Sequence, residues 1–283
     1  MDNKIIEFTE RHISAHESGF DGLFRFLSFS NTPESIDKHK AMLTDGWLYH
    51  TTPESLNDPH DIKFKLKWPG LDDWDEISGF IEDIKLMRSL SGNLFNEKLS
   101  SIQSLLGDDS LKIKLEAALK QSYSQTRVCC FTTSHKNILF WAHYANSHTG
   151  YCIKFKVNDN PKSIFTNTRK IHYSNDYPTI KFPVFSNLVS LLSIILKKAK
   201  NWEYEDEYRS MFSPNWPLQL ENNGSSLSLR NDDISDIYFG MNMKEEDKTK
   251  IIELVEAGPF NPNYWDTRIC KDSFSLDFIK HDP

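Results

Sequence analysis

Three short segments of the sequence hold residues whose types and spacing could support chemistry. They are Leu48 to Asp61, Cys130 to Phe155 and Trp202 to Arg209. On an extended strand Glu203, Glu205 and Glu207 would share one face, because side chains alternate between the two faces of a sheet. Aligned carboxylates repel one another unless a cation compensates them, and Arg209 would lie on the same face. The third segment therefore predicts an acid–base or cation-binding site, with an exposed acidic strand edge as the alternative.

The second segment predicts a strand, a short helix and a returning strand. The first strand ends in hydroxyl residues, and Thr132 and Ser134 are suited either to binding a phosphate or ribose or to capping the helix. Trp141 and Tyr144 lie three residues apart on one helical face, where they would stack on a base or nicotinamide ring or belong to the core. His143 lies between them and is a further candidate for ligand contact. It is followed by a second histidine five residues later, a spacing too weak to predict a metal site.

The first segment combines a strand end with a strong turn signal. Asn57 and Asp58 precede Pro59, a combination typical of an Asx-type turn. Their polar groups would project beside the end of the strand that carries His50. We expect His50, Asn57 and Asp58 to contribute to a binding pocket, with a purely structural turn as the alternative.

Several familiar catalytic patterns are missing from the sequence. It has neither GxGxxG nor GxxxxGK[ST], the glycine loops that hold phosphates. It also has no G-x-S-x-G, H-E-x-x-H or H-x-E…C-x-x-C pattern. The sequence therefore lacks the main motifs of P-loop enzymes, serine hydrolases of the usual type, zinc proteases and zinc deaminases. We predict no metal site.

Composition narrows the class of protein further. The 283 residues carry a net charge of −7, whereas non-specific nucleic-acid binders usually have a basic excess. The four cysteines lie in no C-x-x-C or paired zinc pattern, so we expect free thiols, as in a reducing compartment. The N-terminus lacks the apolar core of a signal peptide, and the longest apolar run is too short to span a membrane. We expect a cytoplasmic protein with no membrane contact.

The elements that must position these segments mix strands and helices without a strict strand–helix–strand repeat. The fold class is therefore predicted as α+β, with a mixed, mainly antiparallel central sheet and flanking helices. We expect one domain over 1–283. Its strands are interrupted by a helical insertion at about 71–125, where apolar residues recur every three to four positions. A further helix is expected at 184–200, ending in lysines that suit the negative end of the helix dipole.

The chain resembles a bacterial family catalogued as domain of unknown function 2971, over about residues 20–280. The residues that carry the resemblance are Leu23-Phe24-Arg25-Phe26, Leu56-Asn57-Asp58-Pro59-His60-Asp61, Cys130-Phe131-Thr132, Trp141-Ala142-His143-Tyr144, His148-Thr149-Gly150-Tyr151-Cys152-Ile153 and Trp202-Glu203-Tyr204-Glu205-Asp206-Glu207-Tyr208-Arg209. His60 departs from the family pattern, which often has an aromatic residue there. The family name implies no activity.

A second resemblance, to the ADP-ribosyltransferase superfamily, does imply one. An early arginine strand, a middle hydroxyl or aromatic strand and a late Glu-x-Glu strand follow in the order of that superfamily. The resemblance implies that Arg25 positions NAD, that Thr132 to Ser134 or Tyr144 support the pocket, and that Glu207 stabilises an oxocarbenium-like state. Glu205 would help to orient the acceptor. The implied protein is a toxin or phage-defence effector that uses NAD as substrate and modifies a macromolecular acceptor, either a protein or a nucleic acid.

Two readings from other classes stay open. A metal-dependent nuclease or RNA-binding effector would use the acidic face to hold Mg²⁺ and the aromatic residues to stack on unpaired bases. A non-enzymatic interaction or sensor module of a defence system would use its aromatic residues in a buried interface.

Overall fold

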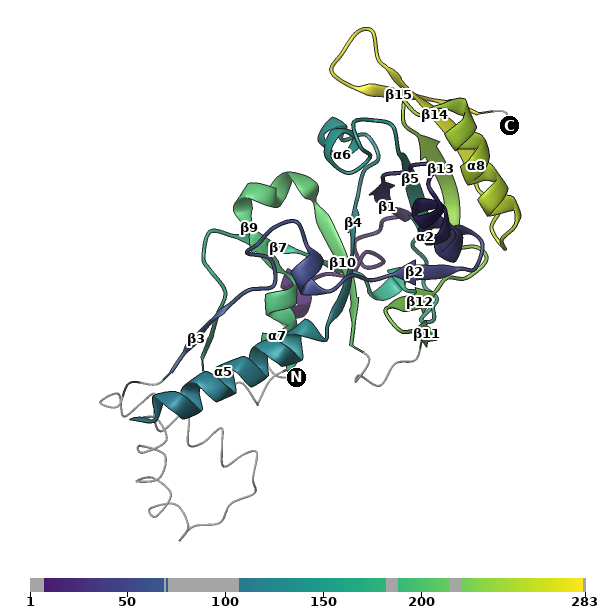
Figure 1. Ribbon diagram of the computed structural model, residues 1–283. Coiled ribbons are helices and arrows are strands. Elements are labelled where there is room, and N and C mark those ends of the chain that lie inside the picture. The colour runs from purple at the N-terminus through teal and green to yellow at the C-terminus, as the bar shows by residue number, and fades with distance from the viewer. Residues whose placement is uncertain (1–7, 69, 71–106, 182–187, 214–219, 282–283) are drawn as a thin grey trace. The chain divides into compact units, whose positions relative to one another are not determined.

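The structure is a computed structural model that describes residues 8–68, 70, 107–181, 188–213 and 220–281 (Figure 1). The chain forms two compact units, each assembled from separated stretches of sequence. The larger unit comprises His12–Thr51, Arg127–Ile171 and Glu203–Pro283, and the smaller comprises Met1–Arg11, Thr52–Thr126 and His172–Trp202. The prediction of a single domain stays a prediction.

The larger unit is built on an eight-stranded sheet with the order β15-β14-β13-β5-β1-β4-β10-β6. Its strands are β1 (Gly22–Leu27), β4 (Arg127–Thr132), β5 (Tyr151–Lys156), β6 (Arg169–Lys170), β10 (Glu207–Phe212), β13 (Ile234–Phe239), β14 (Asn263–Ile269) and β15 (Leu276–Lys280). Neighbours in this sheet are antiparallel except β13 and β14, which are parallel. The predicted α+β class with a mixed, mainly antiparallel sheet is confirmed.

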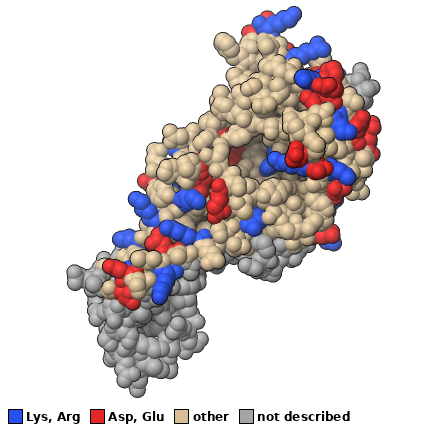
Figure 2. All heavy atoms as spheres, viewed as in Figure 1, with Lys and Arg blue, Asp and Glu red and all other residues tan. Residues whose placement is uncertain are grey.

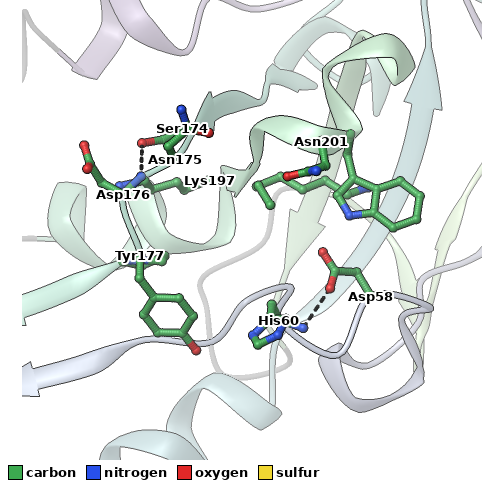
Figure 3. Close-up of a pocket in the computed structure, with 12 residues that line it drawn as sticks. Asp58, His60, Ser174, Asn175, Asp176, Tyr177, Lys197 and Asn201 are labelled. Atoms are coloured by element: carbon green, nitrogen blue, oxygen red, sulfur yellow. Dashed lines mark hydrogen bonds between the residues drawn. The ribbon is translucent and has the colours of Figure 1, made fainter.

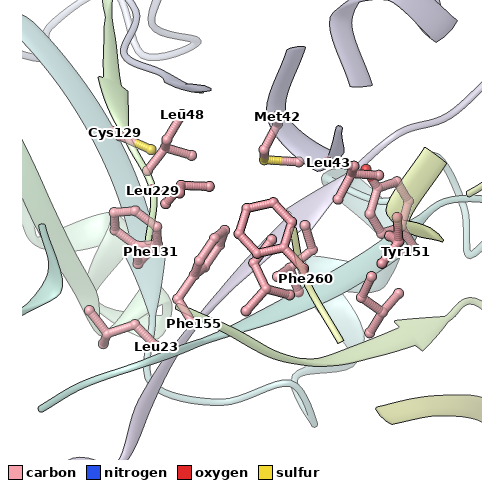
Figure 4. Packing of buried hydrophobic residues seen from close by; sticks show 14 of the residues in the cluster. Leu23, Met42, Leu43, Leu48, Cys129, Phe131, Tyr151, Phe155, Leu229 and Phe260 are labelled. Carbon is pink, nitrogen blue, oxygen red and sulfur yellow. The ribbon is translucent and has the colours of Figure 1, made fainter. Parts of the chain in front are cut away.

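Apolar side chains cover both faces of this sheet. Along β1 the side chains alternate, so that Leu23 enters one hydrophobic cluster while Phe24 and Phe26 enter another. Figure 4 shows the first cluster, in which Leu23 and Phe155 lie among side chains from outside the sheet such as Phe260. Because the central strands are buried on both faces, their polar side chains need partners inside the protein.

The helices of the larger unit are α2 (Pro33–Leu43), α6 (Ile138–His143) and α8 (Glu245–Glu256). Helix α2 begins as its sequence suggests, because Thr32 is its N-cap and accepts a hydrogen bond from the backbone of Ser35 at 3.4 Å. A short 3-10 helix, η2 (Phe165–Asn167), precedes β6. A small three-stranded sheet of β11 (Asn222–Asn223), β12 (Ser226–Ser228) and β2 (Trp47–Tyr49) completes the unit.

The smaller unit holds two parallel strand pairs, β3 (Lys65–Lys67) with β8 (Thr179–Lys181) and β7 (His172–Ser174) with β9 (Lys197–Ala199). Its other elements are the 3-10 turn η1 (Pro53–Ser55) and the helices α5 (Asp109–Ser124) and α7 (Leu188–Ile195). Helix α5 confirms the last part of the predicted helical insertion, whereas 71–106 lie outside the described residues. Among the described residues, no helix has the length and apolar character that crossing a membrane requires.

One predicted helix is wrong at its C-terminal end. The lysines expected to close a helix over 184–200 lie beyond α7, and Lys197 and Lys198 belong to β9 instead. They pair in parallel with His172 and Tyr173 of β7. A long-range strand pair has therefore overridden the local helix pattern, and only residues 188–195 of the prediction are observed as helix.

Strands β1 and β4 meet in an unusual way in the middle of the large sheet. They share one register pair, Phe24 with Thr132, whereas the β1–β5 and β4–β10 ladders hold six pairs each. Beyond that pair Arg25 Nη1 donates to the carbonyl oxygen of Cys130 at 3.3 Å and to the sulfur of Cys129. A side chain therefore bridges the two strands where backbone pairs would continue, and we call this junction the β1–β4 seam.

A buried carboxylate at the start of β13 makes stability depend on pH. Asp233 is fully buried, and burial raises its pKa from the ordinary 3.8 to about 6. Between these values the native protein binds a proton that the unfolded chain has released, so stability falls as pH rises through this window. The loss attributable to Asp233 is about 3 kcal/mol.

We therefore expect Asp233→Asn to be more stable than the parent at pH 7. Its free energy of unfolding should fall much less than that of the parent between pH 4 and pH 6.5. Asparagine can still accept the hydrogen bond that Arg230 N donates to the Asp233 carboxylate at 2.8 Å. Urea unfolding at both pH values measures the effect, with Asp159→Asn as an exposed control. Equal pH dependence in parent and Asp233→Asn would show that Asp233 does not cause it.

Candidate functional site

The candidate site lies in the larger unit, where β4 ends and β10 begins. Thr132 is in register with Glu207 on one side and with Phe24 on the other. Its hydroxyl donates to the carbonyl oxygen of Glu205 at 2.7 Å. The structure thus brings the hydroxyl segment of the sequence beside the acidic segment, and β1 lies on the other side of the hydroxyl segment.

The chain enters β10 through a helical turn and a kink, not along a strand. The 3-10 helix η4 (Lys200–Glu205) comes first, then Asp206 with a left-handed φ of 41°, then β10 from Glu207. The predicted extended strand with Glu203, Glu205 and Glu207 on one face is therefore wrong. Glu203 is exposed, while Glu205 and Glu207 are buried.

Two neighbouring side chains hold Asp206 in this conformation. Thr133 Oγ1 donates to Asp206 Oδ2 at 2.5 Å, and Lys170 Nζ lies 3.4 Å from Asp206 Oδ1. An aspartate tolerates the left-handed region better than most residues, at a cost of about 1 kcal/mol or more. We did not predict this role of Asp206 from the sequence, although an aspartate between two glutamates can favour a kink.

Glu205 is held by the end of α6. The Tyr144 hydroxyl donates to Glu205 Oε1 at 2.5 Å, and Glu205 is only 3% exposed. A charged acceptor strengthens such a hydrogen bond, because the carboxylate lies in a largely dry environment. Tyr144 is half-buried, so one side of this pair remains accessible.

Glu207 forms a buried ion pair with Arg209. Arg209 Nε lies 2.7 Å from Glu207 Oε1, and their exposures are 0% and 2%. The sequence prediction that Arg209 compensates the carboxylates is confirmed for Glu207. The pair gives both charges a partner inside the protein, as buried ionic groups require.

Arg25 lies on β1, and β4 separates it from Glu207 on β10. Phe24, Thr132 and Glu207 are in register and share one face of the sheet, so the backbone of the next residue, Arg25, directs its side chain to the other face. Its backbone register partner on β5 is Ile153, a member of the first hydrophobic cluster. The described hydrogen bonds of Arg25 go to Cys129 and Cys130 at the seam. Burial raises the pKa of the Cys129 thiol, and the charges of Arg25 and Glu207 act on it in opposite directions.

The aromatic residues of α6 divide between core and surface. Trp141 is fully buried, its indole N–H donates to His135 O at 2.7 Å, and its ring packs on Phe26. It is a core residue, because no face of the ring is left for stacking on a ligand. His143 is exposed, and its ring centroid lies 6.4 Å from that of Tyr144. Of this group, Tyr144 alone has a described contact with the acidic segment.

His50 and Ser134 have local structural contacts. The two ring nitrogens of His50 bond Leu48 O and Ser210 Oγ, each at 3.0 Å. Burial lowers the His50 pKa to about 3, so its ring is neutral at physiological pH. Ser134 Oγ accepts a hydrogen bond from Lys136 N at 3.1 Å and shapes the turn before α6.

Asn57 and Asp58 belong to the smaller unit. Asp58 Oδ1 accepts a hydrogen bond from His60 N at 2.8 Å, which is the expected Asx-type turn. Asp58 is buried and lines a cavity of that unit. Within the described parts of the chain, no three or more histidines, cysteines, aspartates or glutamates gather as a metal site would require.

On the face seen in Figure 2, basic and acidic side chains are interspersed, and a wide uncharged area lies between groups of them. The described side chains on that face form no continuous basic stripe of the kind on which non-specific nucleic-acid binding depends.

Comparison with known proteins identifies a family for part of the chain. No curated protein and no solved structure matches it. The matching segment begins in α6, includes β5 and Tyr144, and ends in β10 just after Arg209, so it spans most of the candidate site. Residues 140–210 match the family model described as protein of unknown function (DUF2971).

Proposed function

We propose that this protein is an ADP-ribosyltransferase-like enzyme that cleaves NAD and transfers ADP-ribose to a macromolecular acceptor. One observation carries the proposal: the strands with Arg25, the Thr132 hydroxyl and Glu207 are direct neighbours in one sheet. They occur in the order β1, β4, β10, and Thr132 is in register with a residue of each neighbour. Three features that are far apart in the sequence thus border one small region.

The reaction requires a fixed negative charge. The bond that breaks joins ribose C1′ to the nicotinamide nitrogen, and its electron pair leaves with neutral nicotinamide. Positive charge develops on the ribose, where a preorganised carboxylate stabilises the transition state more than it stabilises the substrate. We assign this role to Glu207, whose carboxylate pairs with Arg209. The new bond joins C1′ to a nucleophilic atom of the acceptor, which releases its proton.

We assign the other residues by their positions around Glu207. Glu205 and Tyr144 form a hydrogen-bonded pair with one accessible side, which suits contact with the acceptor. Arg25 is half-buried at the β1–β4 seam, and an arginine is well suited to the diphosphate of NAD. Because Arg25 faces the opposite side of the sheet, the dinucleotide would have to extend through or around the seam.

Nicotinamide release from NAD, with candidate protein and RNA acceptors present, tests the proposal. We expect Glu207→Gln to lower the rate about 100-fold or more, because it removes the charge that faces the developing cation. Glu203→Gln is the matched control, since Glu203 belongs to the same acidic segment but is exposed. We expect its rate to equal that of the parent.

Glu207→Gln leaves Arg209 buried beside a neutral side chain, so a lost rate in this variant could come from unfolding. A second variant separates an effect on the reaction from an effect on the fold. Tyr144→Phe removes one hydroxyl from a half-buried position and should keep the fold, as judged by circular dichroism. We expect it to lower the rate about tenfold. Absence of nicotinamide release by the folded parent would refute the proposal, as would full activity in a folded Glu207→Gln variant. Cleavage of RNA that depends on Mg²⁺ and ignores NAD would favour the nuclease reading instead.

A further inference from the structure

We infer that the smaller unit holds a separate binding site for a nucleoside monophosphate. The site is a cavity of about 390 Å³ between the Asp58–His60 turn, the segment after β7 and the segment around β9 (Figure 3). This volume lies in the range of small-ligand pockets. The inference does not rest on the proposed NAD chemistry, because it uses none of the residues of the larger unit.

Aromatic side chains line this cavity. Tyr177 is 39% exposed, and its ring meets His60 edge to face at 6.1 Å. Trp202 also lines the cavity, and Lys198 Nζ lies 5.0 Å from the centroid of its ring. Planar rings next to an open space offer stacking surfaces to a nucleobase, and such stacking contributes about 1–3 kcal/mol per base. In Figure 3 Tyr177 and Asn201 lie on opposite sides of the cavity.

Polar groups with complementary roles line the same cavity. Asp58 is 7% exposed and uses one carboxylate oxygen to bind His60 N. A carboxylate has about four acceptor positions, so Asp58 can still accept hydrogen bonds from ribose hydroxyls or a base amine. The Asn201 amide can both donate and accept. Lys197 adds an ammonium group, which suits a phosphate.

The combination selects among ligand classes. Aromatic walls and a carboxylate alone would also fit a neutral sugar, but a neutral sugar has no anionic group to pair with the lysine ammonium. Inorganic phosphate would pair with the lysine but would make no stacking contact with the aromatic side chains. A nucleoside monophosphate uses all three features: the base on the rings, the ribose on Asp58 or Asn201, and the phosphate on Lys197.

Calorimetric titration of the full chain with AMP, GMP and UMP, and with the matching nucleosides and inorganic phosphate, tests this inference. We expect at least one monophosphate to bind about tenfold more tightly than its nucleoside, since the nucleoside lacks the charged contact. In Lys197→Ala that difference should disappear, with the nucleoside affinity unchanged. Lys114 is an exposed lysine of the same unit outside the cavity, so Lys114→Ala should keep the difference in affinity between monophosphate and nucleoside.

Trp202→Ala should weaken the monophosphate and its nucleoside by the same factor of about ten, because both lose the stacking surface. A nucleoside that binds the parent as well as its monophosphate would overturn the inference. So would unchanged affinity in folded Trp202→Ala, or no binding of any monophosphate at millimolar concentration. None of these outcomes depends on whether the chain cleaves NAD.

Discussion

Replacing Arg209 with methionine should lower the free energy of unfolding by about 3–5 kcal/mol, because the substitution leaves a buried carboxylate without its cation. Arg209 is fully buried and Glu207 is 2% exposed, so water cannot take over the interaction. The Nε to Oε1 distance of 2.7 Å makes this a charge-assisted hydrogen bond as well as an ion pair. Urea unfolding at pH 7 measures the change.

The double variant Glu207→Gln/Arg209→Met shows how much of the stability loss comes from leaving the Glu207 charge buried without Arg209, and how much from losing the attraction between the two side chains. It removes both charges at once, so we expect it to recover more than half of the stability that Arg209→Met loses. Arg268→Met, on an exposed position of β14, is the control and should stay within about 0.5 kcal/mol of the parent. A stability of Arg209→Met close to that of the parent would contradict this account of the pair.

Gly150→Ala should lower the free energy of unfolding by about 3 kcal/mol. A Cβ at residue 150 would lie 2.1 Å from the carbonyl oxygen of Leu27 and 3.1 Å from Ser28 Cα. Both are backbone atoms at the end of β1, so no side chain can rotate away to make room. The contact matters for the site, because β1 carries Arg25 and β5 begins at the next residue.

Thermal unfolding compares Gly150→Ala with a glycine in open space. Gly107 has no heavy atom within 4 Å of an added Cβ, so Gly107→Ala should leave the melting temperature nearly unchanged. The expected loss for Gly150→Ala corresponds to a decrease in melting temperature of several degrees. Equal melting temperatures for the two variants would mean that the backbone at Leu27 moves more easily than its position in the sheet suggests.

Much of the large sheet could be predicted from the sequence, because its strands follow local rules. The strand, short helix and returning strand predicted for the second segment are observed as β4, α6 and β5. Helix α2 was predictable for the same reason, since Thr32 and Pro33 give a cap and a first turn. The register that brings the hydroxyl segment of β4 beside the acidic segment of β10 depends on long-range strand pairing.

What could not be predicted depends on side-chain direction and on distant partners. The spacing of Trp141 and Tyr144 gives them one helical face, but it does not say that Phe26 of a distant strand would enclose the indole. The acidic segment alternates like a strand, yet bonds from Thr133 and Lys170 stabilise a kink at Asp206. Both errors arise from tertiary contacts that override local preference, as does the strand β9 in place of a helix end.

The β1–β4 seam has a mechanical consequence. A sheet normally resists separation because each strand boundary must break a row of backbone hydrogen bonds together, but this boundary holds one register pair and the bonds of Arg25. The boundary divides the sheet into a five-strand plate, β15 to β1, and a three-strand plate, β4, β10 and β6. Backbone pairing therefore joins the strands within each plate more strongly than it joins one plate to the other, and side-chain packing such as that of Phe131 on Phe155 holds the plates together. Under load, the backbone ladders should resist separation less along this line than inside either plate.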